Sequence, residues 1–369
     1  MISGADIENL DGLSGVTSIA GNLHIKSNDI LNELTGLENL GYLGGNLYIE
    51  QNDLLVNIQG LESLVNLNGD LVIGDVAWGQ YPYSTGNPML NNLYGLNNLV
   101  SIQGNLKLCG NYTLSSLYGL DNLSLIGGNL QVGGIEFVYG FTFGNPLLEN
   151  LSGLTRLAAI GGGLFIAGNN NLTNLSGLDS LTSIGYHCWF DLNESLSTLQ
   201  GLNSLASIGG SLKIRWNIAL SDISSLGNIA AQTIQDLEII YNQTLAGCSI
   251  QSICDYLAGS NGIAEINDNG PDCNSPEEVE AACNAVSAES TGFVEDHFLF
   301  PNPARKTVTI TGNQTTGIIE VHIYNQTGQK VLHGKPVNNT LDISKLRPGV
   351  YIVEMVNDKR DVRNKLMIE

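Results

Sequence analysis

Apolar residues in the first two thirds of the chain recur with a long, regular period. A Gly-Leu pair marks each repeat, with spacings of 24, 24, 35, 24, 34, 24 and 24 residues, and Ser225-Leu226 follows after another 24. The glycines are Gly12, Gly36, Gly60, Gly95, Gly119, Gly153, Gly177 and Gly201. Each repeat then reads roughly Leu-x-x-Ile-x-Gly-Asn-Leu-x-Ile, and its Leu-x-Ile step has the period of two that is typical of a strand. We expect one good short strand per repeat, with the other segments bent or irregular.

A single coil of this length cannot bury its own leucines. Stacking nine coils would make a continuous aliphatic column, with parallel strands about 4.8 Å apart. The pattern therefore predicts an all-β solenoid of 24-residue coils over residues 1–247. Two of the coils carry insertions of 11 and 10 residues.

An asparagine stands sixteen residues after each repeat glycine, once the insertions are subtracted. We interpret this column as a structural ladder whose amides satisfy backbone groups where the chain turns. The alternative is a polar ligand-binding stripe. The eight residues are Asn28, Asn52, Asn87, Asn111, Asn145, Asn169, Asn193 and Asn217.

The Gly-Leu-x-x-Leu-x-x-Ile-Gly-Gly-x-Leu-x-Ile phrases and the Asn column resemble receptor L-domain repeats, which are relatives of leucine-rich repeats. The resemblance covers about residues 5–247. It implies a right-handed β-solenoid whose faces bind partners, and it implies no particular ligand because fold does not fix function.

Met1 falls in the middle of a coil, because Ile7 and Leu10 align with Leu31 and Leu34 of the next coil. A bare terminal coil would expose its core. We therefore expect preceding sequence, for which a signal peptide and further coils are the candidates.

Four cysteines, Cys248, Cys254, Cys273 and Cys283, cluster after the last repeat. Helix signals accompany them at 250–257 and from Ser275, which precedes a proline and two glutamates. We predict a helical cap at 248–287, stapled by two disulfides of unknown pairing, and a linker at 288–297. A zinc site is the alternative, although a Cys-x-x-Cys knuckle is absent. Cys109 and Cys188 are expected to remain unpaired thiols.

Residues 298–369 lose the 24-residue period and alternate like strands, which predicts a small Ig-like β-sandwich. The segments Pro301-Asn302-Pro303, Leu341-Asp342-Ile343-Ser344 and Pro348-Gly349-Val350-Tyr351 resemble the C-terminal sorting domain of type IX secretion substrates in the Bacteroidetes. The resemblance implies export across the outer membrane, contact with the type IX machinery, and release or anchoring at the cell surface.

Charge and motifs narrow the range of functions. The net charge is −21, with −15 in residues 1–247 and +2 from residue 293 onward, so binding of nucleic acid by the acidic part is disfavoured. No apolar stretch is long enough to span a bilayer as a helix. We find no catalytic or metal-binding motif and expect neither a cofactor nor a metal.

The two insertions carry many aromatic residues and both return to the repeat through Gly-Asn-Pro. We predict that they leave the solenoid at the same edge, two coils apart, and form a ligand site. The alternative is that they only pack on each other. The aromatic residues are Trp78, Tyr81 and Tyr83 in residues 75–86, and Phe137, Tyr139, Phe141 and Phe143 in residues 134–144.

A second candidate surface is the outward position of each strand, where Tyr48, Phe165 and Trp189 stand in the same register. Together these features predict a secreted cell-surface binding protein or adhesin for a glycan or protein, and not an enzyme. The alternatives are a structural spacer or surface-layer component without a specific ligand, and thirdly a glycan-active enzyme.

Overall fold

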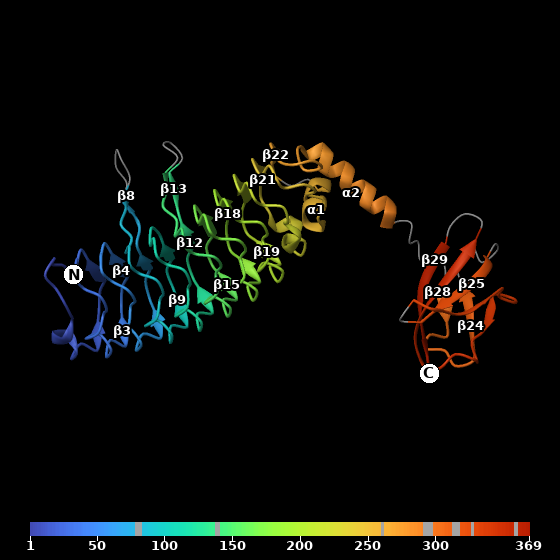
Figure 1. Ribbon diagram of the computed structural model, residues 1–369, viewed down its shortest axis with the longest axis horizontal. Helices are drawn as coiled ribbons and strands as arrows, with labels where there is room; N and C mark the ends of the chain where they lie inside the picture. Colours follow the sequence, from blue (N-terminus) through green and yellow to red (C-terminus); the bar gives the residue numbers. More distant parts are fainter. Residues whose placement is uncertain are drawn as a thin grey trace. The chain divides into compact units, whose positions relative to one another are not determined.

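The computed structural model describes residues 1–77, 83–136, 141–259, 262–290, 298–311, 318–325, 328–357 and 361–369. They form two compact units, Met1–Cys283 and Asn284–Glu369. The first unit is the predicted β-solenoid together with its cap, and Figure 1 shows its coils stacked from the N-terminus in blue to the cap in orange.

A ten-stranded parallel sheet runs along the whole solenoid, one strand per coil, in the strand order of the sequence. The side chains at the first and third positions of each strand, mostly leucine and isoleucine, point into the core, as the period of two predicts. The strands are β2 (Leu23–Lys26), β4 (Leu47–Glu50), β6 (Leu71–Ile73), β10 (Leu106–Leu108), β12 (Leu130–Gly133), β16 (Leu164–Ala167), β18 (Cys188–Asp191), β20 (Leu212–Arg215), β21 (Leu237–Ile240) and β22 (Ala264–Asn267).

A second, narrower ladder was not expected from the sequence. Most coils add a two-residue parallel strand at the isoleucine or leucine before the turn glycines, where we expected irregular chain. These strands are β1 (Ser18–Ile19), β3 (Tyr42–Leu43), β5 (Asn66–Leu67), β9 (Ser101–Ile102), β11 (Leu125–Ile126), β15 (Ala159–Ile160), β17 (Ser183–Ile184) and β19 (Ser207–Ile208).

The repeat glycine is required by close packing between coils. At Gly201 the φ angle is +115°, and an added Cβ would lie 2.0 Å from the carbonyl oxygen of Leu175 in the preceding coil. A side chain is excluded there by both conformation and space. Short 3₁₀ turns take the place of this arrangement in the first coil and the ninth: η1 (Asp11–Leu13), η2 (Ser224–Leu226) and, later in the ninth coil, η3 (Ala231–Thr233).

The solenoid extends further than residue 247, where the sequence placed its end. β22 pairs with β21 in parallel from Ala264 to Asn267, inside the segment assigned to the helical cap. The repeat count missed this tenth coil because its strand, Ala-Glu-Ile-Asn, has a single large apolar residue.

The cap has the predicted two disulfides, Cys248–Cys273 and Cys254–Cys283, so the zinc alternative is wrong. Its helices are α1 (Gln251–Ala258) and α2 (Pro276–Ser290), and α2 continues three residues into the predicted linker. The hydroxyl oxygen of Ser275 accepts a hydrogen bond from the amide of Glu278 at 3.2 Å, as expected of a helix N-cap.

The second unit is a β-sandwich, as predicted. One sheet has the order β23 (Phe298–Phe300), β24 (Thr307–Thr311), β27 (Thr340–Asp342), and the other β26 (Lys330–Gly334), β25 (Ile318–Tyr324), β28 (Gly349–Asn357), β29 (Asp361–Ile368). All pairs are antiparallel, and one shared core includes Val308 from the first sheet and Val353 from the second.

Candidate functional site

The asparagines form one buried column along the solenoid. In the middle of it, the backbone amide and Nδ2 of Asn87 both donate to Oδ1 of Asn111, at 3.0 and 3.2 Å. Asn87 Nδ2 also donates to the carbonyl oxygen of Ile49 at 2.9 Å. All eight asparagines are fully buried, so none of them faces a ligand. The geometry is that of the structural ladder and not of a ligand-binding stripe.

Two further residues extend the column. Asn217 donates to Asn242 Oδ1, and Asn242 donates to Asn269 Oδ1. The sequence analysis did not include them because the intervals lengthen to 25 and 27 residues at this end of the solenoid.

A residue with positive φ follows each strand of the long sheet and turns the chain out of it. In ordinary coils this residue directly precedes the ladder asparagine. In the two coils with insertions it is a glycine, Gly74 (φ +70°) or Gly133 (φ +77°), from which the insertion departs. At Gly133 an added Cβ would lie 2.0 Å from the carbonyl oxygen of Ala167, so only glycine fits.

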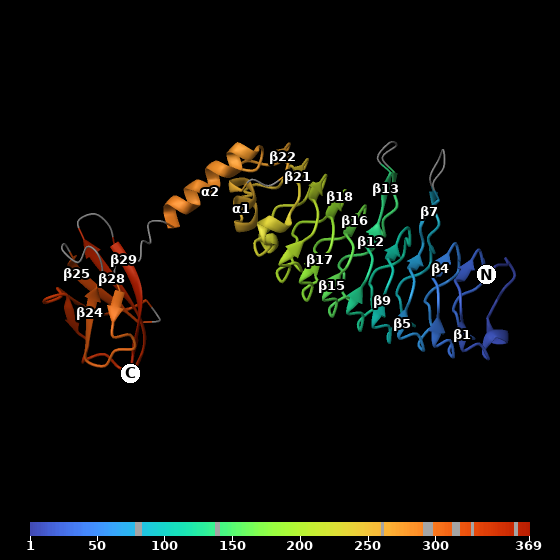
Figure 2. The ribbon, with the colours of Figure 1, turned by 180° about the vertical axis from the view of Figure 1, so that it is seen from behind.

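Both insertions are antiparallel hairpins. The first hairpin pairs β7 (Val76–Ala77) with β8 (Tyr83–Ser84), and the second pairs β13 (Ile135–Glu136) with β14 (Phe141–Thr142). They leave the sheet after β6 and β12, which are separated by β10 alone. Figures 1 and 2 show both projecting from the same side of the solenoid.

The base of the first hairpin is held by a polar cluster. Thr85 Oγ1 donates to Glu50 Oε1 at 2.9 Å and accepts from the amide of Asp75 at 2.9 Å. Glu50 Oε2 also lies 2.8 Å from His24 Nε2, and the carboxylate of Asp75 forms an ion pair with Lys107. These carboxylates are therefore engaged in holding the hairpin to the sheet.

The aromatic residues predicted to bind a ligand differ in how exposed they are and in whether the structure describes them. Tyr83 is 56% exposed at the base of the first hairpin. Phe143, on the return of the second hairpin, is only 5% exposed, so little of its side chain is available to a ligand. Phe141 belongs to β14, and Trp78, Tyr81, Phe137 and Tyr139 lie outside the described residues.

The outward face of the long sheet has the predicted register. Its central residues align in successive strands, from His24 and Tyr48 through Phe165 and Trp189 to Lys213 and Glu238. Tyr48 lies on the N-terminal side of the first hairpin, where its hydroxyl accepts from Asn46 at 2.6 Å. Phe165 and Trp189 lie beyond the second hairpin, so the structure separates Tyr48 from them.

Beside the second hairpin this face is hollowed into a groove of about 250 Å³. The rings of Phe165 and Trp189 meet edge to face in it, with centroids 5.1 Å apart. Trp189 Nε1 is buried and has no hydrogen-bond partner among the described residues. We call this the Trp189 groove; its lining is Gln131, Gly133, Gly134, Ile135, Phe165, Ala167, Trp189 and Asp191.

A charged pair, Asp191 and Arg215, lies at the Trp189 groove, and Asp191 is part of its lining. Arg215 donates to both carboxylate oxygens of Asp191, and its guanidinium lies 5.8 Å from the centroid of the Trp189 ring. Burial raises the pKa of the Asp191 carboxyl above its ordinary value, although the hydrogen bond and charge of Arg215 act in the opposite direction. Arg215 also contacts Glu238 at 3.4 Å.

Two aromatic residues that the sequence analysis missed continue this surface. Trp216 and Tyr241 stack with centroids 5.5 Å apart and an interplanar angle of 6°. Both have positive φ, 55° and 58°, at the position that directly precedes a ladder asparagine. Left-handed backbone is unfavourable for bulky residues and concentrates at functional sites. The sequence signal that could have found them was their position in the repeat, directly before a ladder asparagine. Two other coils have a glycine at this position, Gly110 and Gly168.

The remaining cysteines play no part in this surface chemistry. Cys109 and Cys188 are buried free thiols. Burial raises the pKa of Cys109 to about 12 and raises that of Cys188 as well. Within the described ranges no three His, Cys, Asp or Glu side chains are arranged to hold a metal ion.

Comparison with known proteins identifies the second unit. Residues 298–369 match the family of the secretion system C-terminal sorting domain, which is the sorting signal of type IX secretion. No curated protein matches the chain. In the described part of the chain, no helix combines the length and apolar character needed to cross a bilayer. The sorting domain directs the protein out of the cell, and the protein is therefore a type IX secretion substrate that is released or held at the cell surface.

Proposed function

We propose that this exported solenoid is a binding protein, and that the outward sheet face beside the second hairpin holds its ligand. The observation that supports this most is the Trp189 groove, a recess lined by the rings of Phe165 and Trp189, where the Trp189 indole N–H is buried without a partner among the described residues. A buried donor without an acceptor is costly, and a ligand carbonyl or hydroxyl would relieve that cost.

A protein is the ligand class that the groove favours over a glycan. The groove is small and walled largely by rings and glycine backbone, a shape that suits one apolar anchor side chain. Trp189, Arg215, Trp216 and Tyr241 are of the residue types that dominate binding energy at protein interfaces. A glycan stacked on the hairpin aromatics is the other candidate, and an adhesive role is compatible with either.

The hairpins would form the wall of the site. Two insertions of matched position emerge from an otherwise regular scaffold, and the second lines the groove through Gly134 and Ile135. The proposed contact residues of the hairpins are Trp78, Tyr81, Tyr83, Phe137, Tyr139 and Phe141. Replacing Trp78, Tyr83, Tyr139 and Phe141 by alanine together should weaken binding by orders of magnitude and leave the core of the solenoid intact.

Two finer proposals accompany this one. We propose that the solenoid is related to receptor L-domains, for which the Gly-Leu period and the Asn column are the support. We also propose that it binds without catalysis, because Glu50, Asp75 and Asp191 on this face are each paired with a lysine or arginine. A spacer without a ligand and a glycan-active enzyme are the competing readings.

The test is binding of the full-length chain to arrays of cell-surface proteins and of glycans, followed by variants. Trp189→Ala should weaken protein binding by about tenfold or more. Trp189→Phe keeps a ring but removes the N–H and should have an intermediate effect. Tyr48→Ala is the matched control, because Tyr48 has the same register on β4 beyond the first hairpin.

Normal binding by Trp189→Ala would contradict the groove as the site. Binding to glycans alone would replace the protein ligand with a carbohydrate. A chain that binds nothing on either array would favour the spacer.

A further inference from the structure

The glycine repeat changes between the eighth and ninth coils. In the second to eighth coils the repeat glycine packs directly against the coil before it, as Gly201 does against Leu175. At the equivalent position the ninth coil has Ser225 within the 3₁₀ turn η2. A serine side chain could not occupy the glycine's position, so the chain takes a different path.

The backbone hydrogen bonds between the coils differ accordingly. The amide of Leu175 donates to the carbonyl oxygen of Gln200, which directly precedes the repeat glycine. One coil later the amide of Leu199 donates instead to Asp222, two residues earlier than the equivalent Ser224. Residues 223–226 therefore stand away from the neighbouring coil.

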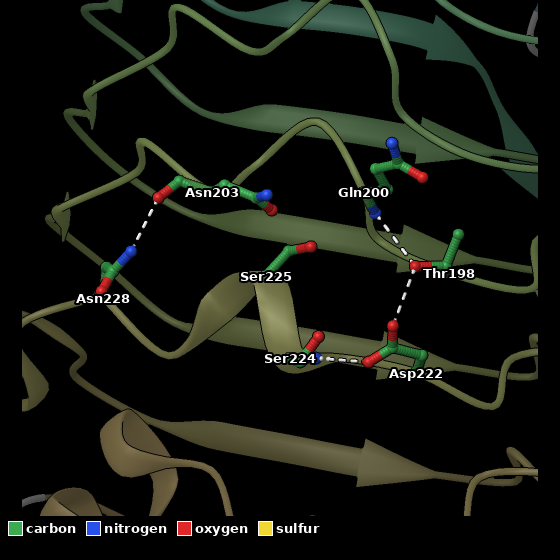
Figure 3. Close-up of a pocket in the computed structure, with 7 residues that line it drawn as sticks. All are labelled: Thr198, Gln200, Asn203, Asp222, Ser224, Ser225 and Asn228. Atoms are coloured by element: carbon green, nitrogen blue, oxygen red, sulfur yellow. Dashed lines mark hydrogen bonds between the residues drawn. The ribbon is translucent and has the colours of Figure 1, made fainter. Parts of the chain in front are cut away.

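A groove of about 410 Å³ opens where the two coils separate. Figure 3 shows its lining, which is polar throughout: Thr198, Gln200, Asn203, Asp222, Ser225 and Asn228 are the side chains that matter here. It lies on the arc of the coil between the Asn ladder and β19, outside the long sheet. We call it the coil 8–9 groove.

Part of the lining is fixed in place. Thr198 Oγ1 donates to Asp222 Oδ2 at 3.4 Å and accepts from the amide of Gln200 at 3.2 Å. The amide of Ser224 donates to Asp222 Oδ1 at 2.8 Å, and this bond lowers the pKa of the Asp222 carboxyl below its ordinary value. Asp222 is thus a carboxylate acceptor at neutral pH.

Other polar groups in the lining are available to a ligand. The side-chain amides of Gln200 and Asn203 make no hydrogen bond in the described structure, and both residues are exposed. Figure 3 shows the Ser225 hydroxyl directed into the space between them. The groove therefore offers amide donors, amide acceptors, a hydroxyl and a carboxylate, with no Lys, Arg or His in its lining.

We propose that the coil 8–9 groove binds a neutral saccharide. Vicinal sugar hydroxyls both donate and accept, which matches planar amide and carboxylate groups that are already oriented. An anionic ligand would face Asp222 with no cation to balance it. This site is independent of the protein ligand proposed for the Trp189 groove.

The test titrates neutral monosaccharides and their oligomers, namely those of glucose, galactose, mannose and N-acetylglucosamine, into the full-length chain by calorimetry and ligand-observed NMR. The double variant Gln200→Ala, Asn203→Ala should weaken binding by about tenfold or more. Its fold should be unaffected, because neither side chain has a partner in the described structure.

Two controls separate the possible results. Ser176→Ala changes the residue equivalent to Gln200 one coil earlier and should leave sugar binding unchanged. Trp189→Ala should also leave it unchanged, whatever its effect on protein binding. The proposal is overturned if the parent binds none of these sugars, or if the double variant binds them as the parent does.

Discussion

Arg215 binds Asp191 through two hydrogen bonds, from Nε to Oδ1 at 2.7 Å and from Nη2 to Oδ2 at 2.9 Å. The carboxylate is almost completely buried, and Arg215 is the cation that contributes most to keeping it charged. Replacing Arg215 by glutamine should cost about 3–5 kcal/mol of unfolding free energy, because a buried carboxylate loses its counter-charge. Chemical denaturation of the parent and the variant measures the difference.

The same pair predicts a dependence on pH. The pKa of Asp191 is raised in the folded protein, so its contribution to stability is fully present below the unfolded pKa and is lost as pH rises through the folded pKa. Without Arg215 the folded pKa rises further, so the deficit of Arg215→Gln should grow as the pH rises above the unfolded aspartate pKa of about 4. The double variant Asp191→Asn, Arg215→Gln should lose that added slope; a deficit that is constant with pH would contradict the charge argument.

The Asn ladder should be the most sensitive polar feature of the solenoid. Asn111→Ala removes the acceptor used by Asn87 and the donor to the carbonyl oxygen of Ile73 at 2.8 Å. Each buried group left without a partner costs about 1–3 kcal/mol, so a loss of about 2–5 kcal/mol is expected. Asn39→Ala is the matched control, because Asn39 also bonds to the preceding coil but is exposed; equal losses from the two variants would argue against the ladder.

Reduction of the cap should loosen the C-terminal coils first. The disulfides close loops of 25 and 29 residues, and chain entropy assigns each about 3–4 kcal/mol. Peptide mapping of the unreduced protein should find Cys248 with Cys273 and Cys254 with Cys283. Hydrogen exchange with and without reductant should show faster exchange in β21 and β22 before β4, and uniform loosening would contradict a local role.

The two free thiols should be unreactive in the native protein. Cys109 is fully buried with a pKa of about 12, and Cys188 is buried in the core, so neither forms a reactive thiolate near pH 8. Iodoacetamide should label neither in the folded protein and both after denaturation. Fast native labelling of Cys109 would show that the sheet between the hairpins opens.

Export should depend on the last strand of the sorting domain. β29 pairs with β28 over eight residue pairs, and its Leu366 and Ile368 are buried in the sandwich core. A periplasmic reporter fused to the cap and sorting domain should reach the surface in a host with type IX secretion. Deletion of residues 359–369 should retain it in the periplasm, and surface delivery without them would refute the prediction.

The repeat explains how much of this fold was predictable. One coil gives a weak signal, but stacking forces the same residue type into the same place each time, as with Asn87 and Asn111. Prediction failed where the register changed, at Asn242 and Asn269. The burial of Phe143 was also not predicted, because it depends on how the hairpin folds back.

The candidate site was less predictable than the fold. Phe165 and Trp189 could be placed as neighbours by counting, since strands are in register. The approach of the second hairpin to these two rings depends on tertiary packing, which the repeat pattern does not show. The pairing of Arg215 with Asp191 depends on it too. Trp216 and Tyr241 occupy a position with positive φ that glycine holds in two other coils, at Gly110 and Gly168, and no local preference predicts aromatic rings there.

The spacing of the hairpins follows from the strand between them. Because β10 lies between β6 and β12, the bases of the two hairpins are separated by two strand spacings of about 4.8 Å each. Gain or loss of a 24-residue unit would shift the hairpins by one such step while preserving the leucine contacts on either side. The position of the hairpins along the solenoid can therefore change only in whole coils.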